Sequence, residues 1–189
     1  MRNTMVIPAC LAMLIDGGAA LAGDPTTAPS TPRSAVATVL PLGAGTARGT
    51  VRFTQLDHGV EIKAEITGLT PGAHGFHIHE YGDCSAADGS SAGGHFNPEG
   101  KAHGGPGMEM SHAGDYGNMT ADASGHAALT LVSRRITLDQ GPTGALGRSV
   151  IVHEKTDDLA SQPAGNAGPR IGCGVILLES GPTTPILKK

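Results

Sequence analysis

Apolar and polar residues alternate with a period of two along much of the chain. Between positions 60 and 66, every even position is apolar and every odd position is charged. Successive side chains of a strand point to opposite faces, so this segment predicts a strand with one buried face and one solvent-exposed face. Similar short runs predict strands at 36–40, 50–56, 75–80, 126–132, 149–153 and 172–178. No segment of the sequence has the 3.6-residue apolar period of an amphipathic helix.

The segments between these predicted strands are short turns and two long loops. Asp57-His58-Gly59 is typical of a tight hairpin turn. The Gly-rich segments 81–118 and 154–171 are too long for hairpin loops, and loops of such length are usually functional or disordered. We therefore predict an all-β fold: an antiparallel Greek-key β-sandwich or flattened barrel of about eight strands, with two long functional loops.

Composition supports this fold class and excludes some partners. The chain has 189 residues, which suits one domain, and its 29 Gly and 13 Pro favour turns and loops over helices. Charged residues make up 16% and the net charge is -4, which excludes both the basic composition of a nucleic-acid-binding protein and the high charge of a disordered one. We expect no nucleic-acid partner.

The N-terminus has the layout of a secretory signal peptide. Arg2 precedes an apolar run that is too short to span a bilayer, and Ala20-Leu21-Ala22 offers a cleavage site. A cytoplasmic N-terminus is the alternative interpretation, and acylation of Cys10 in a lipoprotein is a further one.

This interpretation divides the chain into four parts and assigns a compartment. We predict a signal peptide at 1–22, a flexible tether at 23–34, one domain at 35–179 and a flexible tail at 180–189. The mature protein would be periplasmic or secreted, with no membrane insertion. Removal of the signal peptide leaves Cys84 and Cys173 as the only thiols, and an even pair in an exported protein is most simply a disulfide.

Potential metal ligands are concentrated in two regions of the sequence. His77 and His79 are two apart in a predicted strand, so both imidazoles project from the same face. The first long loop and the end of a later strand add His95, His103, His112, Asp115 and His153. A Gly-rich loop has no hydrophobic reason to be ordered, and metal binding would supply the missing free energy. The other three histidines of the predicted domain are expected to be ordinary surface or core residues: His58, His74 and His126.

Six ordered motifs between about residues 36 and 178 resemble those of the copper/zinc superoxide dismutase family. They are GFHIHEYGD (75–83), GHFNP (94–98), KAHGGP (101–106), HAGDYGN (112–118), VHEKTDDL (152–159), and GNAGPR (165–170) followed by CGVI (173–176). The resemblance is specific, because all six occur in order and every ligand position is filled. It implies the same two-sheet sandwich as the strand pattern.

The resemblance also implies two metal sites that share one residue. The copper ligands would be His77, His79, His95 and His153. The zinc ligands would be His95, His103, His112 and Asp115. His95 would bridge the metals as an imidazolate. Imidazoles suit copper, and three nitrogens with one carboxylate form the closed set typical of structural zinc.

The implied function is an enzyme activity, the dismutation of superoxide to dioxygen and hydrogen peroxide by alternate reduction and reoxidation of the copper. It would protect against extracytoplasmic oxidative stress. His95 would carry a proton for this reaction, and Arg170 would attract the anionic substrate. Asp157 would accept hydrogen bonds from one copper histidine and one zinc histidine.

Two features leave alternatives open. The segment 160–165 is shorter than in many eukaryotic members of the family and lacks their Lys and Glu residues. Met108 and Met110 would form either a copper-entry site or an ordinary exposed loop. A non-catalytic copper chaperone or store, and a zinc-only domain, are the competing functions. The sequence leaves open a homodimer and a copper-delivery partner.

Overall fold

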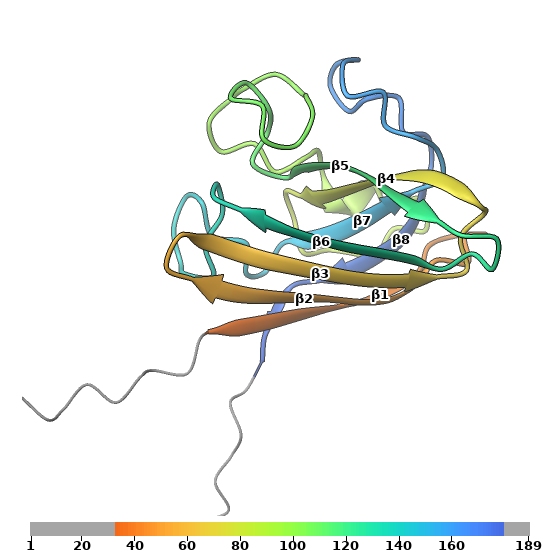
Figure 1. Cartoon of the computed structure of the whole chain (residues 1–189), viewed down its shortest axis with the longest axis horizontal. Helices are drawn as coiled ribbons and strands as arrows, with labels where there is room; N and C mark the ends of the chain where they lie inside the picture. Colours follow the sequence, from red (N-terminus) through yellow and green to blue (C-terminus); the bar gives the residue numbers. More distant parts are fainter. Residues whose placement is uncertain (1–32, 180–189) are drawn as a thin grey trace, which may run out of the picture. The chain divides into compact units, whose positions relative to one another are not determined.

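The computed structural model describes residues 33–179, whose regular structure is almost entirely β-strand. Figure 1 shows these strands stacked in two layers. The elements are β1 (Ser34–Pro41), β2 (Arg48–Leu56), β3 (Gly59–Thr67), β4 (Gly72–His79), the 3-10 turn η1 (Ser90–Ala92), β5 (Asp115–Ala121), β6 (Ala127–Ser133), β7 (Ser149–His153), β8 (Arg170–Val175) and β9 (Leu177–Leu178).

All strand pairs are antiparallel, and their order is β5-β4-β7-β8-β1-β2-β3-β6, with β9 beside β1. The layer that contains β2, β3 and β6 packs against the layer of β4, β5, β7 and β8 (Figure 1). Strand β1 joins the layers, because its first residues pair with β2 and its last two, Leu40 and Pro41, pair with β8. This arrangement confirms the predicted antiparallel Greek-key sandwich.

The core lies between the layers and is built by the alternating patterns of the strands. In β3, Val60, Ile62, Ala64 and Ile66 are at most 1% exposed, while the charged residues between them are not buried. Burial of one Ile side chain contributes about 1.5–3 kcal/mol. Phe53 of β2 packs in the same cluster. The apolar face of β2 and β3 therefore packs against the layer whose strands carry the histidines.

One strand lies where a loop was predicted. β5 begins at Asp115, inside the segment 81–118 that the sequence assigned to the first long loop. Its pattern is interrupted by a bulge, in which Tyr116 and Gly117 oppose the single residue Phe76 of β4. Gly117 has a φ of 69°, a left-handed conformation that favours glycine. A period of two does not detect such a strand, because the bulge shifts its inward face.

The predicted last strand, 172–178, is divided in two. β8 ends at Val175, and β9 contains only Leu177 and Leu178. Between them, the backbone N–H of Ile176 donates to Arg148 O at 2.8 Å instead of continuing the ladder. The two halves consequently pair with opposite ends of β1.

The ordered sheet begins inside the segment predicted as a tether. Ser34 is the first residue of β1, and the Arg33 guanidinium donates to Leu138 O at 3.0 Å. The predicted signal peptide and tail, 1–22 and 180–189, lie outside the described residues. Between residues 33 and 179, no helix has the length and apolar character needed to cross a membrane.

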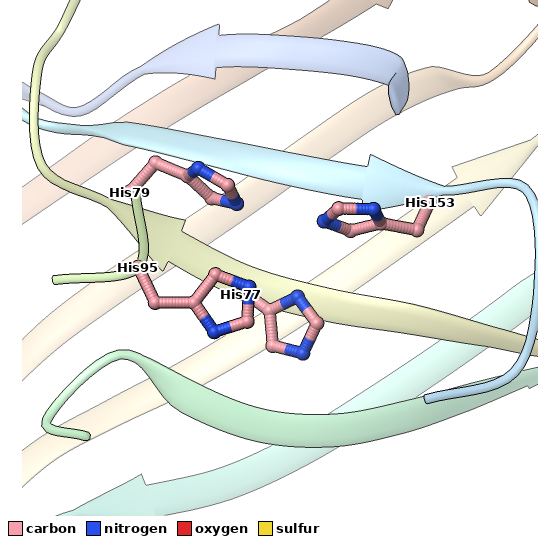
Figure 2. Close-up of side chains that lie close together, drawn as sticks. All are labelled: His77, His79, His95 and His153. Atoms are coloured by element: carbon pink, nitrogen blue, oxygen red, sulfur yellow. The ribbon is translucent and has the colours of Figure 1, made fainter. Parts of the chain in front are cut away.

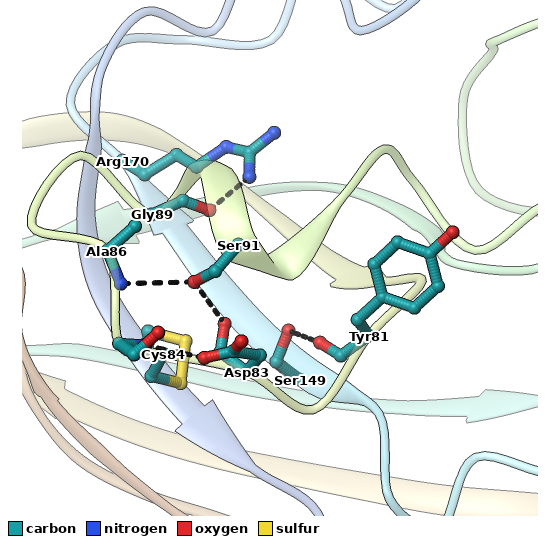
Figure 3. Close-up of a disulfide and its surroundings, with 10 residues drawn as sticks. Tyr81, Asp83, Cys84, Ala86, Gly89, Ser91, Ser149 and Arg170 are labelled. Carbon is teal, nitrogen blue, oxygen red and sulfur yellow. Dashed lines mark hydrogen bonds between the residues drawn. A yellow bond between two sulfur atoms is a disulfide. The ribbon is translucent and has the colours of Figure 1, made fainter.

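A disulfide connects the first long loop to the sheet. Cys84 and Cys173 are bonded across 89 positions of sequence, with their Cα atoms 5.8 Å apart, as predicted from the even pair of thiols (Figure 3). Cys173 is a buried residue of β8, in a small apolar cluster with Leu42 and Ile151. The disulfide therefore attaches the loop that follows β4 to a buried position of β8.

Candidate metal centre

Four imidazoles converge beside the antiparallel pair of β4 and β7. His77 and His79 project from alternate positions of β4, and His153 is the last residue of β7. His95 comes from the first long loop and lies beside these residues, because its backbone forms an isolated β-bridge with that of His79. One ring nitrogen of each residue lies within 4.8 Å of one nitrogen of each other member, and all four residues are buried (Figure 2).

A second group of buried ligands lies directly beside the first. His95, His103, His112 and Asp115 also place their ligand atoms within 4.8 Å of one another. Asp115 is the centre of this group, since its carboxylate oxygens lie 2.8 Å from His95 Nδ1, 3.1 Å from His103 Nδ1 and 3.2 Å from His112 Nδ1. Three ring nitrogens thus surround one carboxylate.

His95 belongs to both groups and presents a different nitrogen to each. Its Nδ1 lies against Asp115, while its Nε2 is buried without a hydrogen-bond partner. The ring stacks on His77 with centroids 3.9 Å apart. A single imidazole is therefore placed between two potential metal positions.

The other nitrogens of the first group show which atoms are available to a metal. His77 Nδ1, His79 Nε2 and His153 Nε2 are buried and have no hydrogen-bond partner. The opposite nitrogen of each ring is bonded, to Asp157 Oδ2 at 2.8 Å, Gly93 O at 3.1 Å and Gly168 O at 3.1 Å respectively. Each bonded nitrogen is a donor to an oxygen, so the free nitrogen of a neutral ring carries the lone pair. Buried polar atoms normally have partners, and a metal ion fits here as the missing one.

The electrostatic surroundings keep these rings neutral. Burial lowers the pKa of His77 and of His79 well below its usual value, and the nearby His95 lowers both further. Burial also lowers the pKa of His153 to about 4, although its bond to Gly168 opposes this. Neutral imidazoles at physiological pH are ready to bind a metal without first losing a proton.

Asp115 stays anionic although it is buried. Burial by itself would raise the pKa of its carboxyl group. Hydrogen bonds from His95 and from the backbone N–H groups of Gly104 and His112 outweigh burial and lower the pKa to about 2. The second group thus contains one permanent negative charge, which suits a divalent cation.

Asp157 connects the two groups from the second long loop. Its carboxylate accepts hydrogen bonds from His77 Nε2 at 2.8 Å and from His103 Nε2 at 2.9 Å, and its side chain is fully buried. Gly165 lies so close that a Cβ there would be 1.8 Å from Asp157 Oδ1, which explains why the loop has glycine at this position. A single carboxylate therefore fixes the orientation of one ring in each group.

Arg170 lies at the rim of the first group and is held by the disulfide-linked loop. Its guanidinium donates to Gly89 O, as Figure 3 shows, and to Gly93 O at 2.7 Å. Gly93 O also accepts the hydrogen bond from His79, so one carbonyl orients both side chains. Arg170 and His153 line a small cavity of about 220 Å³ under the second long loop.

Comparison with known proteins decides the family. The family model described as copper/zinc superoxide dismutase matches residues 47–176. The chain belongs to the copper/zinc superoxide dismutase family. It is 43% identical over 145 residues to an extracellular copper/zinc superoxide dismutase of Brugia pahangi, which covers 72% of each chain. A crystal structure of the clock protein EA4 is similar, with a TM-score of 0.71, 42% identity and coverage of 81% of this chain and 99% of that one.

Membership of the copper/zinc superoxide dismutase family confirms the predicted activity and cofactors. The protein is an enzyme that dismutates superoxide to dioxygen and hydrogen peroxide, and its cofactors are copper and zinc. The structure brings together each of the two ligand sets that the sequence singled out. It also places Asp157 against both sets and Arg170 beside the first.

One residue of this superoxide dismutase centre was not singled out by the sequence. His74 is buried in β4, where its Nδ1 lies 2.9 Å from His153 O and its Nε2 lies 2.8 Å from Thr70 O. It thereby ties the backbone of a centre histidine to the start of β4. No local signal distinguishes His74 from His126, whose side chain is 43% exposed and pairs with Glu65. Only the pairing of distant strands separates their roles.

Proposed function

We propose that the first group of imidazoles binds the catalytic copper and the second group binds zinc. The copper ligands would be His77, His79, His95 and His153, and the zinc ligands would be His95, His103, His112 and Asp115. The observation that carries this assignment is the set of buried, unpartnered ring nitrogens in the first group. Four nitrogens without a carboxylate favour copper, while three nitrogens and one carboxylate favour tetrahedral zinc.

Within this proposal, His95 moves a proton as well as binding metal. When bound, copper supplies the exchange of single electrons with superoxide, and zinc supplies fixed positive charge. His95 Nδ1 stays within the zinc set beside Asp115, so Nε2 is the nitrogen that can take up a proton and pass it to the peroxide product. Formation of hydrogen peroxide needs two protons, and the second comes from water.

Arg170 is the residue that we assign to substrate attraction. The net charge of -4 repels superoxide at long range, so attraction must come from a local positive field. The guanidinium is half-buried, stays charged at any relevant pH and is held by two backbone carbonyls, Gly89 O and Gly93 O. Its position on the cavity beside His153 supports a direct contact with the anion.

Asp157 is assigned a positioning role. It holds the Nε2 atoms of His77 and His103, which leaves the Nδ1 atom of each ring for its metal. Loss of this carboxylate would free both rings to rotate. We expect Asp157→Asn to weaken binding of both metals, because an amide presents one oxygen acceptor instead of two.

The test of the assignment is metal content measured together with superoxide consumption. We expect His77→Ala to lose copper and activity while it keeps zinc, and His112→Ala to lose zinc first. His126→Ala is the matched control: this partly exposed histidine lies outside both sets, so the variant should keep both metals. The reverse pattern of metal loss would overturn the assignment. A copper-loaded native protein that does not consume superoxide would instead indicate a copper store.

The domain organisation is part of the proposal. Residues 1–22 would be a signal peptide followed by a tether, and the domain would begin at Arg33, just before β1, and be followed by a tail at 180–189, so that the mature enzyme is periplasmic or secreted. The disulfide supports an oxidising compartment, and the relative from Brugia pahangi is an extracellular enzyme. N-terminal sequencing of exported protein should begin at Gly23. A mature protein that starts at Met1 would contradict export.

We propose a homodimer from the exposed apolar side chains of β1 and β9. Leu40, Leu177 and Leu178 are 61%, 59% and 53% exposed beside a groove of about 400 Å³ along β1 and β8. Apolar side chains clustered at a surface favour a protein interface. Sedimentation of Leu40→Lys and of the native enzyme checks this. Identical monomeric behaviour of both would refute it.

We also propose a copper-delivery partner that contacts the loop before His112. Met108 and Met110 are 56% and 62% exposed there, and thioether sulfur is a soft ligand for Cu(I). Met110→Leu should slow loading of copper from a Cu(I) donor and leave the fully loaded enzyme unchanged. Equal loading rates would leave these side chains as ordinary loop residues.

A further inference from the structure

The tip of the second long loop, residues 160–164, is hydrogen-bonded to the rest of the protein through one side chain. Asp158 closes this turn from within, since its carboxylate accepts hydrogen bonds from the backbone N–H groups of Ala160 and Ser161 at 3.0 and 2.8 Å. In the part of the chain that the structure describes, the amide of Gln162 makes all the hydrogen bonds between the tip and other segments. Gln162 is therefore the hydrogen-bonded anchor of the tip.

Both polar atoms of the Gln162 side chain bond to the backbone of His103. The N–H of His103 donates to Gln162 Oε1 at 2.7 Å, and Gln162 Nε2 donates to His103 O at 2.9 Å. This exchange of two hydrogen bonds has the form of one bonded pair in an antiparallel ladder, and it fixes the orientation of the amide. The ring of His103 is held from the same loop, by Asp157 Oδ1 at 2.9 Å. The second loop therefore holds both the backbone and the ring of one member of the second group.

The tip also forms part of the wall of the cavity beside the first group. Gln162, Pro163 and Ala164 line this cavity of about 220 Å³, as do His153 and Arg170. Its volume is below the range of about 300–1,000 Å³ that is typical of pockets for small organic molecules, and it suits an anion of a few atoms. No residue of the tip carries a charge, so its contribution to the cavity is steric and the positive field comes from Arg170.

We propose that Gln162 is a positioning residue, which holds the tip against His103 and thereby keeps the cavity beside Arg170 too small for anions larger than superoxide. Gln162 acts through the backbone of His103 and needs no contact with either metal. The short uncharged tip would thus select the substrate by size, while Arg170 selects it by charge. The inference rests on the proposed function, because the size of this cavity matters to the reaction only if the first group binds the catalytic copper.

Hydrogen exchange and anion competition in the full-length enzyme loaded with copper and zinc test this proposal. Gln162→Met keeps the length of the side chain and removes both hydrogen bonds. The backbone amide of His103 should exchange at least about fivefold faster in this variant, which is the factor that one net hydrogen bond supplies. Azide, an anion of three atoms, is followed by the visible absorption of the copper, and benzoate competes with it. The Kd of benzoate should fall at least about fivefold in Gln162→Met, while the Kd of azide stays within about twofold of the native value.

Gln140→Met is the matched control, because Gln140 is exposed and lies outside the cavity and both ligand groups. This variant should match the native enzyme in both measurements. An unchanged ratio of benzoate to azide affinity in Gln162→Met would overturn the proposal, and so would an unchanged exchange rate of the His103 amide. Both results leave the metal assignment intact. Failure of azide to bind the copper-loaded native enzyme would refute the assignment of the first group, and this proposal with it.

Discussion

Removal of the disulfide should weaken both the fold and the copper side of the centre. The bond closes a segment of 89 positions between Cys84 and Cys173. In the chain-entropy model, a closed segment of this length stabilises the folded state by about 4–5 kcal/mol. For a domain of this size, such a loss corresponds to a decrease in Tm of about 10–20 °C.

The functional part of this effect follows from the loop that the disulfide holds. That loop carries Gly89 O and Gly93 O, which anchor Arg170, and Gly93 O also fixes the Nδ1 side of His79. If the loop is no longer attached to β8, both side chains lose a fixed acceptor. We expect the rate constant for superoxide to fall about three- to tenfold at full copper occupancy, equivalent to about 0.7–1.4 kcal/mol.

Cys84→Ala is the suitable variant, because it leaves Cys173 in place within its apolar cluster and creates no cavity there. Ser85→Ala is the control, since it alters an exposed side chain of the same loop. Denaturant unfolding at matched metal content gives the free energy, and pulse radiolysis gives the rate. A loss below about 1 kcal/mol would refute the entropic argument. An unchanged rate would refute the anchoring of Arg170 by the loop.

Three further predictions concern charge and metal binding. Arg170→Ala should keep both metals but lower the second-order rate constant for superoxide about tenfold or more. Added salt should slow this variant less than it slows the native enzyme. A native rate constant in the fully loaded variant would exclude a role of Arg170 in substrate attraction. Asp115→Ala should lose zinc before copper in metal analysis, because it removes the carboxylate of the zinc set, and loss of copper alone would contradict this. In metal-free protein, the pKa of His153 is lowered by burial from 6.5 to about 4, so the unfolded chain binds a proton that the folded chain does not. The contribution of His153 to the free energy of unfolding should be fully present above about pH 6.5 and fall by about 3 kcal/mol toward pH 4. Urea unfolding that shows no loss of stability across this range would refute the lowered pKa of His153.

The local pattern of residues was sufficient for the sandwich and for a cluster of candidate ligands, whereas the division of these ligands into two sets came from the resemblance to the family. The alternation at 60–66 predicts β3 because a strand has a period of two, and the buried and exposed positions of β3 follow it. His77 and His79 are two apart, so they share a face wherever their strand lies. The pairing of Cys84 with Cys173 followed from a count of thiols. These inferences need only short-range geometry or composition.

Other features were decided only by contacts between distant segments. β5 was missed because the bulge at Tyr116 and Gly117 breaks its alternation of buried and exposed residues. The strand can be recognised only from its pairing with β4. The contact of His74 with His153 O spans 79 positions, and the Arg170 contact with Gly93 O spans 77. β5 and β6 end the strand order without pairing with each other, which depends on how the two layers fold. A local pattern reports which face of a strand is buried, whereas the partner of a buried nitrogen or carbonyl depends on how the strands pair and the loops fold back.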